Sequence, residues 1–320
     1  MPPSLSKFAT LTRLSVTELV RQPICLLLTL GATVLTITVP LATAHQIGQQ
    51  SNLARDSALA FQFVIGMLLA AHASCSTLTA EIRSNTALTV LSKPVGRDML
   101  FAAKFAAVAA VVLLFGLCSA AAGLLADRLA PRFFEFDALG LTLAAAAIGA
   151  PLAAAGAANA FRGARFSSTA LAALAFSLWA AALTLAFFDR EGNPARFGAD
   201  MDWRLIPAAA LVTLALVLLS ALALSLATRL PAAPTAAILA TALFAGLISS
   251  YLIAILPRVA AARFALRAAL PDLQSFWPAD DLAAGGPLDP NALLRASLYA
   301  TLYTGGLLCF GTLSFRRRQF

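Results

Sequence analysis

Residues Phe105–Ala126 read FAAVAAVVLLFGLCSAAAGLLA and contain no Asp, Glu, Lys or Arg in 22 positions. An α-helix rises about 1.5 Å per residue, so about 20 apolar residues cross a bilayer core roughly 30 Å thick. In lipid, a single segment satisfies its own backbone hydrogen bonds only as a helix. This stretch therefore predicts a transmembrane helix, and we expect the function of the chain to be carried out in or across a membrane.

Seven further stretches share this length and this lack of charge: Ile24–Ala44, Ala58–Leu78, Ala138–Ala160, Thr169–Phe188, Leu205–Ala227, Ala236–Leu256 and Ala296–Phe315. Composition agrees, because 60% of the residues are hydrophobic and only 12% are charged, whereas soluble domains carry roughly 25% charged residues. We therefore predict an all-α, polytopic helical membrane protein. It would have about eight transmembrane helices in a single transmembrane domain over residues 1–320.

The distribution of charge predicts the orientation. If the N-terminus is cytoplasmic and every apolar run crosses once, the cytoplasmic pieces hold 13 of the 23 Lys and Arg residues and 3 of the 15 Asp and Glu residues. Positive residues favour the cytoplasmic side, and the arginines Arg316–Arg318 after the last run strengthen the bias. An even number of spans then places both termini in the cytoplasm. The net charge of +8 is explained by anionic lipids of the inner leaflet, so we expect no nucleic-acid partner.

The N-terminal segment Ser4–Gln22 has the spacing of an amphipathic helix that ends before Pro23. Apolar side chains, among them Phe8, gather on one half of the helical wheel, and Arg13 and Arg21 fall on the other half. Because basic amphipathic helices lie in the plane of the membrane surface, an interfacial helix is predicted. The alternative is that these residues are the cytosolic start of the first spanning helix.

The segment Glu81–Lys104 separates the second and third apolar runs on the predicted cytoplasmic side. Leu88 and Leu91 are spaced to line one face of a short helix, and Pro94 biases Lys93 toward extended backbone. A short helix, a break and a second short helix are therefore predicted. A solvated connector and a docking element for a cytoplasmic partner are equal interpretations of this segment.

Two other connections are less informative. We interpret the turn Phe161–Ser168, with its two arginines, as a topology anchor. Residues 257–292 are predicted to form an outer-side loop with short helices, in which Phe276 and Trp277 are interfacial aromatics.

No nucleotide-binding or catalytic motif of the common kinds occurs in the sequence. It has no G-x-x-x-x-G-K-[ST], H-E-x-x-H or G-x-S-x-G. The four cysteines lie in apolar runs without a C-x-x-C pair and are interpreted as small buried hydrophobes. We therefore expect the chain to bind no metal and no cofactor and not to be an enzyme. Because no Asp, Glu, Lys or Arg stands within an apolar run, we expect its driving energy to come from a partner.

His72 lies within the second apolar run, where an ionisable group is a candidate functional residue, here of a transport pathway. The favoured interpretation is that a neutral His72 hydrogen-bonds a neighbouring helix. An intramembrane enzyme would lose its activity on His72→Ala, whereas a permease would tolerate the change.

These features together resemble the permease subunits of ABC-2 type transporters. The resemblance rests on the pattern Glu81, Thr86, Pro94, Val95, Arg97 and Lys104, and on the C-terminal end Phe315-Arg316-Arg317-Arg318-Gln319-Phe320. Residues Leu270–Tyr303 resemble the pre-terminal outer segment of the subgroup that includes the permease linked to copper-enzyme maturation in nitrous oxide reduction. The middle of the chain departs from the family plan of six spans. An extra hairpin, within Thr169–Ala227, or a half-inserted run would account for the difference.

The resemblance implies a multi-pass protein of the bacterial inner membrane that pairs with a second permease copy or a paralogue. Each permease would bind a separate cytoplasmic ABC ATPase, which holds the ATP and Mg²⁺, and transport would be export. Residues 4–22 would be the connecting helix, and residues 81–100 would be the coupling segment that docks into the ATPase. Its implied coupling residues are Glu81, Arg83, Thr86, Leu88, Leu91, Lys93, Pro94 and Arg97. The alternative function is a membrane scaffold or assembly subunit that uses an ABC ATPase without classical export.

Overall fold

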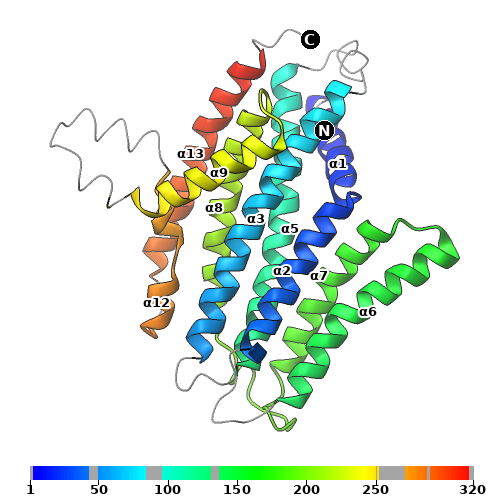
Figure 1. The fold of residues 1–320 in the computed structure, drawn as a ribbon, viewed down its shortest axis with the longest axis vertical. Coiled ribbons are helices and arrows are strands. Elements are labelled where there is room, and N and C mark those ends of the chain that lie inside the picture. The colour runs from blue at the N-terminus through cyan, green and yellow to red at the C-terminus, as the bar shows by residue number, and fades with distance from the viewer. Residues whose placement is uncertain are drawn as a thin grey trace.

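The computed structural model describes residues 3–42, 50–83, 96–130, 137–249, 251, 271–286 and 289–316, and these residues form helices without a β-strand (Figure 1). Seven helices are long and apolar enough to cross a membrane: α2 (Pro23–Ala42), α3 (Gln50–Arg83), α5 (Arg97–Leu129), α6 (Ala138–Arg162), α7 (Phe166–Leu185), α8 (Leu205–Ala227) and α13 (Pro290–Arg316). The polytopic all-α architecture is thus confirmed. Among the described residues the spans number seven, where eight were predicted.

The N-terminal helix α1 (Pro3–Val20) ends before a turn at Arg21 and Gln22, and α2 begins at Pro23. The chain is thus helical over Pro3–Val20, and this helix ends ahead of Pro23. One face of α1 packs on the bundle, chiefly on α5, and buries Ser15 and Leu19.

Helices α3, α5 and α8 form the centre of the bundle. In both α5 and α8, 72% of the most apolar part of the helix is buried inside the protein. Glycines bring these helices close together, since Gly66 of α3 lies against Leu216 of α8 and Gly116 of α5 lies against Thr213 of α8. Small residues are typical of such close helix contacts in membrane proteins.

Helices α6 and α7 form a hairpin at the side of the bundle (Figure 1). Ser177 of α7 donates a 2.6 Å hydrogen bond to the carbonyl of Ala147 in α6, and the Trp179 indole donates to the carbonyl of Leu117 in α5. The hairpin at the side of the bundle therefore spans Ala138–Leu185. Residues Leu205–Ala227 belong to the region that was expected to hold an extra hairpin, but they form the central helix α8.

Of the predicted span Ala236–Leu256, the structure describes residues 236–249 and 251, and most of these belong to the 16-residue helix α9 (Ala232–Leu247). Helix α9 runs obliquely to the other helices (Figure 1). Its end meets a segment that follows later in the chain, because the Leu273 amide donates a 3.3 Å hydrogen bond to the carbonyl of Gly246. That segment contains the 3₁₀ turn η1 (Gln274–Phe276) and α12 (Ala279–Ala283) and leads to the start of α13.

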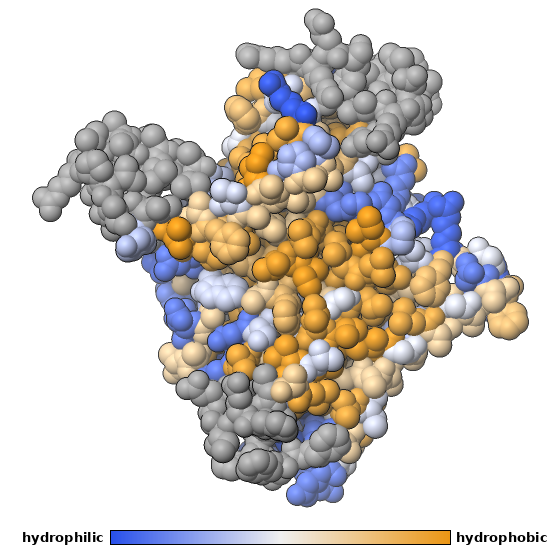
Figure 2. All heavy atoms as spheres, viewed as in Figure 1, coloured by the Kyte–Doolittle hydropathy of each residue, from blue (hydrophilic) through white to orange (hydrophobic). Residues whose placement is uncertain are grey.

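Because α9 and the segment 271–286 together carry the chain from one end of the bundle to the other, both termini lie at the same end despite seven full-length spans (Figure 1). We call this end the termini end and the other the opposite end. Figure 2 shows apolar side chains over the middle of the visible face and hydrophilic residues gathered toward its edges. Such a surface fits a protein surrounded by lipid.

Candidate functional site

The termini end joins the first helix, the last helix and both flanks of the predicted coupling segment. Its buried apolar core, which we call the termini-end cluster, consists of Cys75, Leu78, Leu100, Phe101, Leu224, Ala227 and Phe315. Leu11 of α1 packs against this cluster. The rings of Phe101 and Phe315 lie 5.8 Å apart between centroids, so the start of α5 contacts the end of α13 directly.

The predicted coupling residues lie at this end where the structure describes them. Glu81 and Arg83 belong to the last turn of α3, and Arg97 opens α5. The other predicted coupling residues lie in 84–95, outside the described residues: Thr86, Leu88, Leu91, Lys93 and Pro94.

The second short helix predicted after Pro94 is wrong, because the chain from Arg97 onward is the beginning of the 33-residue helix α5. Lys104, which was assigned to a cytoplasmic loop, is only 4% exposed within this helix. A Lys reaches such a position only where the surrounding groups compensate its burial.

The predicted interfacial residues of α1 lie on two sides of the helix. Phe8 is half-buried, while Arg13 and Arg21 are exposed. Leu5, an apolar residue of the same helix, is 52% exposed. The buried face of α1 therefore packs on protein, and its outer face is the part left for a membrane surface or a partner.

His72 hydrogen-bonds Gln22, with 2.8 Å between His72 Nε2 and Gln22 Oε1. Gln22 lies in the turn between α1 and α2, so His72 bonds this turn, where the favoured interpretation expected a neighbouring helix. This contact also places His72 beside the turn from which α2 begins.

The opposite end contains a network of buried charges that the sequence did not suggest. Arg55 donates from Nε to Asp127 (2.6 Å) and from Nη1 to Asp202 (3.0 Å). Asp127 also accepts a 2.9 Å bond from the backbone amide of Asp202. Arg204 pairs with the Asp202 carboxylate at 2.6 Å and donates to the carbonyl of Gly286. The network therefore ties the start of α3, the end of α5 and the loop before α8 to the segment before α13.

Two opposing effects act on the carboxyl group of Asp202. Burial alone would raise its pKa, but hydrogen bonds from Arg204 and the charges of Arg55 and Arg204 lower the pKa overall. The carboxylate form is therefore the one that this network stabilises.

A second buried arginine fixes the hairpin α6–α7. Arg128, 1% exposed, donates from Nε to Asp137 at 2.8 Å. Its two other nitrogens donate to carbonyl groups at and after the end of α7, those of Leu185, Phe188 and Asp189. Asp137 in turn caps α6 by accepting a 2.6 Å bond from the amide of Gly140. One guanidinium group thus joins the ends of α5 and α7 to the start of α6.

Sequence reasoning missed these groups because it ended each span at the first charge. Asp127 and Arg128 directly follow the apolar run Phe105–Ala126, so they were assigned to a loop. The signal that could have indicated a buried network was the adjacent pair Asp127 and Arg128, two opposite charges directly after a long apolar run.

The segment 271–286 was predicted as part of an outer loop with short helices, and it contains η1 and α12, but its aromatic side chains pack on protein. Leu273 and Phe276 are fully buried, and the Trp277 ring stacks on Phe63 of α3 at 6.1 Å between centroids. The Asp272 amide donates a 3.0 Å bond to the hydroxyl oxygen of Tyr299 in α13. Irregular backbone at this depth is tolerated where protein surrounds it. The residues 257–270 of the predicted loop lie outside the described part of the chain.

The cysteines follow the prediction in three cases of four. Cys25, Cys75 and Cys118 are buried, but Cys309 on α13 is exposed. Within the described residues, no three side chains of His, Cys, Asp or Glu gather as a metal site would require.

Comparison with known proteins leaves the family open. No protein-family model matches this sequence, and no curated protein matches it significantly.

Proposed function

We propose that this chain is the transmembrane subunit of an ATP-driven transporter of the ABC-2 type, with a separate cytoplasmic ATPase that docks at the termini end. The observation that carries the proposal is the termini-end cluster. It brings Leu11 of α1, Phe101 of α5 and Phe315 of α13 into one packed unit, next to the helices that flank residues 84–95. The N-terminal helix, the start of α5 after the connector and the end of α13 are thus in direct contact.

Helix α5 provides a route for the motion that such coupling requires. It starts at Arg97, directly after the connector 84–95, and continues for 33 residues, about 50 Å, to the buried charges at the opposite end. A displacement at its first turn would act on Asp127 and Arg128 through a continuous helix. This geometry supports a role in which a partner drives the membrane helices from the termini end.

The substrate path in this proposal runs between two copies of the chain. Within one copy, the contacts of Gly66 with Leu216 and of Gly116 with Thr213 close the centre of α3, α5 and α8. The same tight centre favours the second candidate function, a membrane scaffold or assembly subunit that uses an ABC ATPase without classical export. In that case the chain would respond to the ATPase as a rigid unit.

Purification of a tagged chain from its native host in mild detergent, followed by mass spectrometry, tests the proposal. A roughly stoichiometric P-loop ATPase is the expected companion. A Leu88→Asp, Leu91→Asp variant purified in parallel should reach the membrane but lose that ATPase.

Recovery of the chain without any ATPase would overturn the proposal and leave residues 84–95 as an ordinary connector. Recovery of the ATPase with stable additional membrane proteins, and with turnover that no substrate stimulates, would favour the scaffold.

A further inference from the structure

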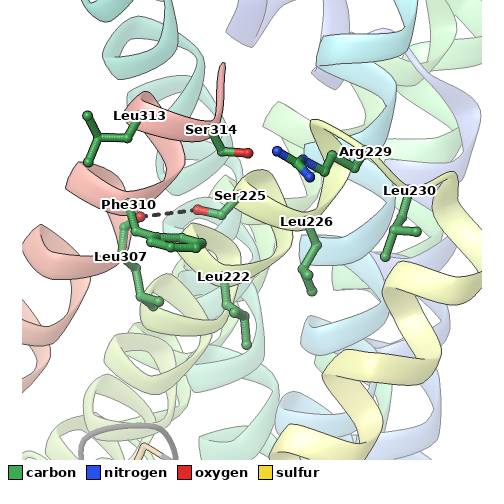
Figure 3. Close-up of a pocket in the computed structure, with 9 residues that line it drawn as sticks. All are labelled: Leu222, Ser225, Leu226, Arg229, Leu230, Leu307, Phe310, Leu313 and Ser314. Atoms are coloured by element: carbon green, nitrogen blue, oxygen red, sulfur yellow. Dashed lines mark hydrogen bonds between the residues drawn. The ribbon is translucent and has the colours of Figure 1, made fainter. Parts of the chain in front are cut away.

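A pocket of about 570 Å³ opens between α8, α13 and the chain that leads into α9, at the termini end. Figure 3 shows α13 on one side, α8 behind and α9 on the other side. Helix α8 contributes one face to it, with Leu222, Ser225 and Leu226, and Leu230 follows at the turn before α9. The size lies in the range of 300 to about 1,000 Å³ that is typical of sites for small molecules.

The lining of the pocket is divided between an apolar body and a cationic rim. Phe310 and Leu313 of α13 are 69% and 57% exposed, so this wall continues into the apolar outer surface of the bundle. At the rim, Arg229 and Ser314 point toward one another from opposite sides (Figure 3). The pocket therefore presents a charge at one end and a path for a hydrocarbon chain at the other.

The guanidinium group of Arg229 has no hydrogen-bond or ion-pair partner within the described residues, whereas Arg55, Arg128 and Arg204 are all paired. Arg229 is exposed, and its backbone belongs to the turn after α8, where the amides of Arg229 and Leu230 both donate to the carbonyl of Leu226. The pocket-lining residue Ser314 lies across the rim from Arg229. An anion is thus the complementary ligand.

We propose that this pocket binds an anionic phospholipid of the surrounding bilayer. Its phosphate accepts hydrogen bonds from Arg229, with Ser314 as a neighbouring donor, and an acyl chain lies along Leu222 and Phe310. Arg is well suited to phosphate because its donors fit two phosphate oxygens. A soluble phosphate would use only the rim and leave the apolar body without a ligand. The proposal goes beyond transport, since it requires neither an ATPase nor a substrate.

Bound lipid can be counted by native mass spectrometry of the full-length chain, with any co-purifying subunits, extracted from nanodiscs that contain phosphatidylglycerol and phosphatidylcholine. We expect phosphatidylglycerol to be retained in preference to phosphatidylcholine. Arg229→Gln should weaken that retention about fivefold, the effect of roughly one cationic contact with an anionic lipid. Leu226→Trp, which fills the pocket but keeps the arginine, should weaken it as well.

Arg162→Gln is the matched control, because Arg162 is an exposed arginine at the end of α6 and does not line this pocket. Equal losses in Arg229→Gln and Arg162→Gln would show a general attraction to anionic lipid and overturn the site. Unchanged retention in both pocket variants would overturn it too. Glycerol 3-phosphate, which carries the phosphate without acyl chains, should not displace the lipid, and effective competition would assign the rim to a soluble anion instead.

Discussion

Asp127 Oδ1 accepts a 2.6 Å hydrogen bond from Arg55 Nε, and this ion pair joins the end of α5 to the start of α3 at 0% and 11% side-chain exposure. The pair is formed by residues 72 positions apart in the sequence. This ion pair connects α3 and α5, the longest described helices of the bundle, at the opposite end.

Replacing Arg55 by Gln is expected to lower the free energy of unfolding by about 3 kcal/mol, because it leaves the Asp127 carboxylate buried without its cation. Chemical unfolding in detergent would measure the loss. Arg295→Gln serves as the control, since its ion pair with Asp289 is 76% and 53% exposed and should contribute less than about 1 kcal/mol. Equal effects of the two changes would contradict a structural role for the buried network.

Arg128→Lys should loosen the loop 186–204 even though it conserves the charge. A single ammonium group cannot reach Asp137 and three separate carbonyl groups with the geometry of a guanidinium group. We expect faster amide hydrogen exchange at residues 186–190 in the variant and unchanged exchange in α8. Protection equal to that of the unmodified chain would show that the fork of hydrogen bonds contributes little.

Gly116→Leu is expected to separate α5 from α8, because a Cβ atom at this position would already collide with the side chain of Thr213. The variant should be recovered in low yield or with a lower midpoint of thermal unfolding. Gly149→Ala is the matched control within a helix, since nothing lies within 4 Å of its added Cβ. That substitution should be neutral or stabilise by about 0.5–1 kcal/mol.

Acid should open the loop before α8. The pKa of Asp202 lies below its ordinary value of 3.8, because the partners Arg204 and Arg55 outweigh the effect of burial. The stabilisation is therefore fully present above that ordinary value and is lost as the pH falls through the lower pKa of the folded state. Hydrogen exchange at residues 186–204, corrected for its intrinsic pH dependence, should rise below about pH 4. Asp202→Asn should be less protected at neutral pH and lack this acid step.

The coupling hypothesis also makes a prediction for each single variant, Leu88→Asp or Leu91→Asp, that differs from the loss of the ATPase expected of the double variant. Either change places a charge on the predicted apolar face of the connector, so it should uncouple ATP hydrolysis from transport while membrane insertion stays normal. Hydrolysis and transport by the reconstituted complex, measured side by side, would show the difference. Full transport by either variant would remove the coupling role from this segment.

Much of the architecture could be predicted from the sequence because lipid imposes simple demands. Runs such as Phe105–Ala126 and Leu205–Ala227 contain no charge and must be helical in a bilayer, and both are central helices here. The turn before Pro23 was also predictable, since proline removes a backbone donor within the helix. These features depend on local chemistry alone.

Long-range pairing explains what could not be predicted. Arg55, Asp127 and Asp202 look like ordinary loop charges until folding brings them together. The apolar run Ala236–Leu256 looks like a full span, and only the tertiary structure shows that Gly246, near the end of α9, hydrogen-bonds Leu273 of a later segment. For the candidate site, the sequence predicted the flanks of the connector, whereas the contact of Phe101 with Phe315 and the pocket at Arg229 depend on the tertiary structure.

The two-part crossing made by α9 and residues 271–286 has a consequence for biogenesis. The segment 271–286 is held by residues that are synthesised later, since the Asp272 amide bonds the Tyr299 hydroxyl group and the segment leads into α13. Helices α3 and α8, on which α9 packs, are made before it, but the hydrogen bond between Gly246 and Leu273 forms only after later residues have been synthesised. A nascent chain truncated before Tyr299 is expected to be more accessible to proteases around Gly246 than a chain that includes α13, because α13 supports this crossing.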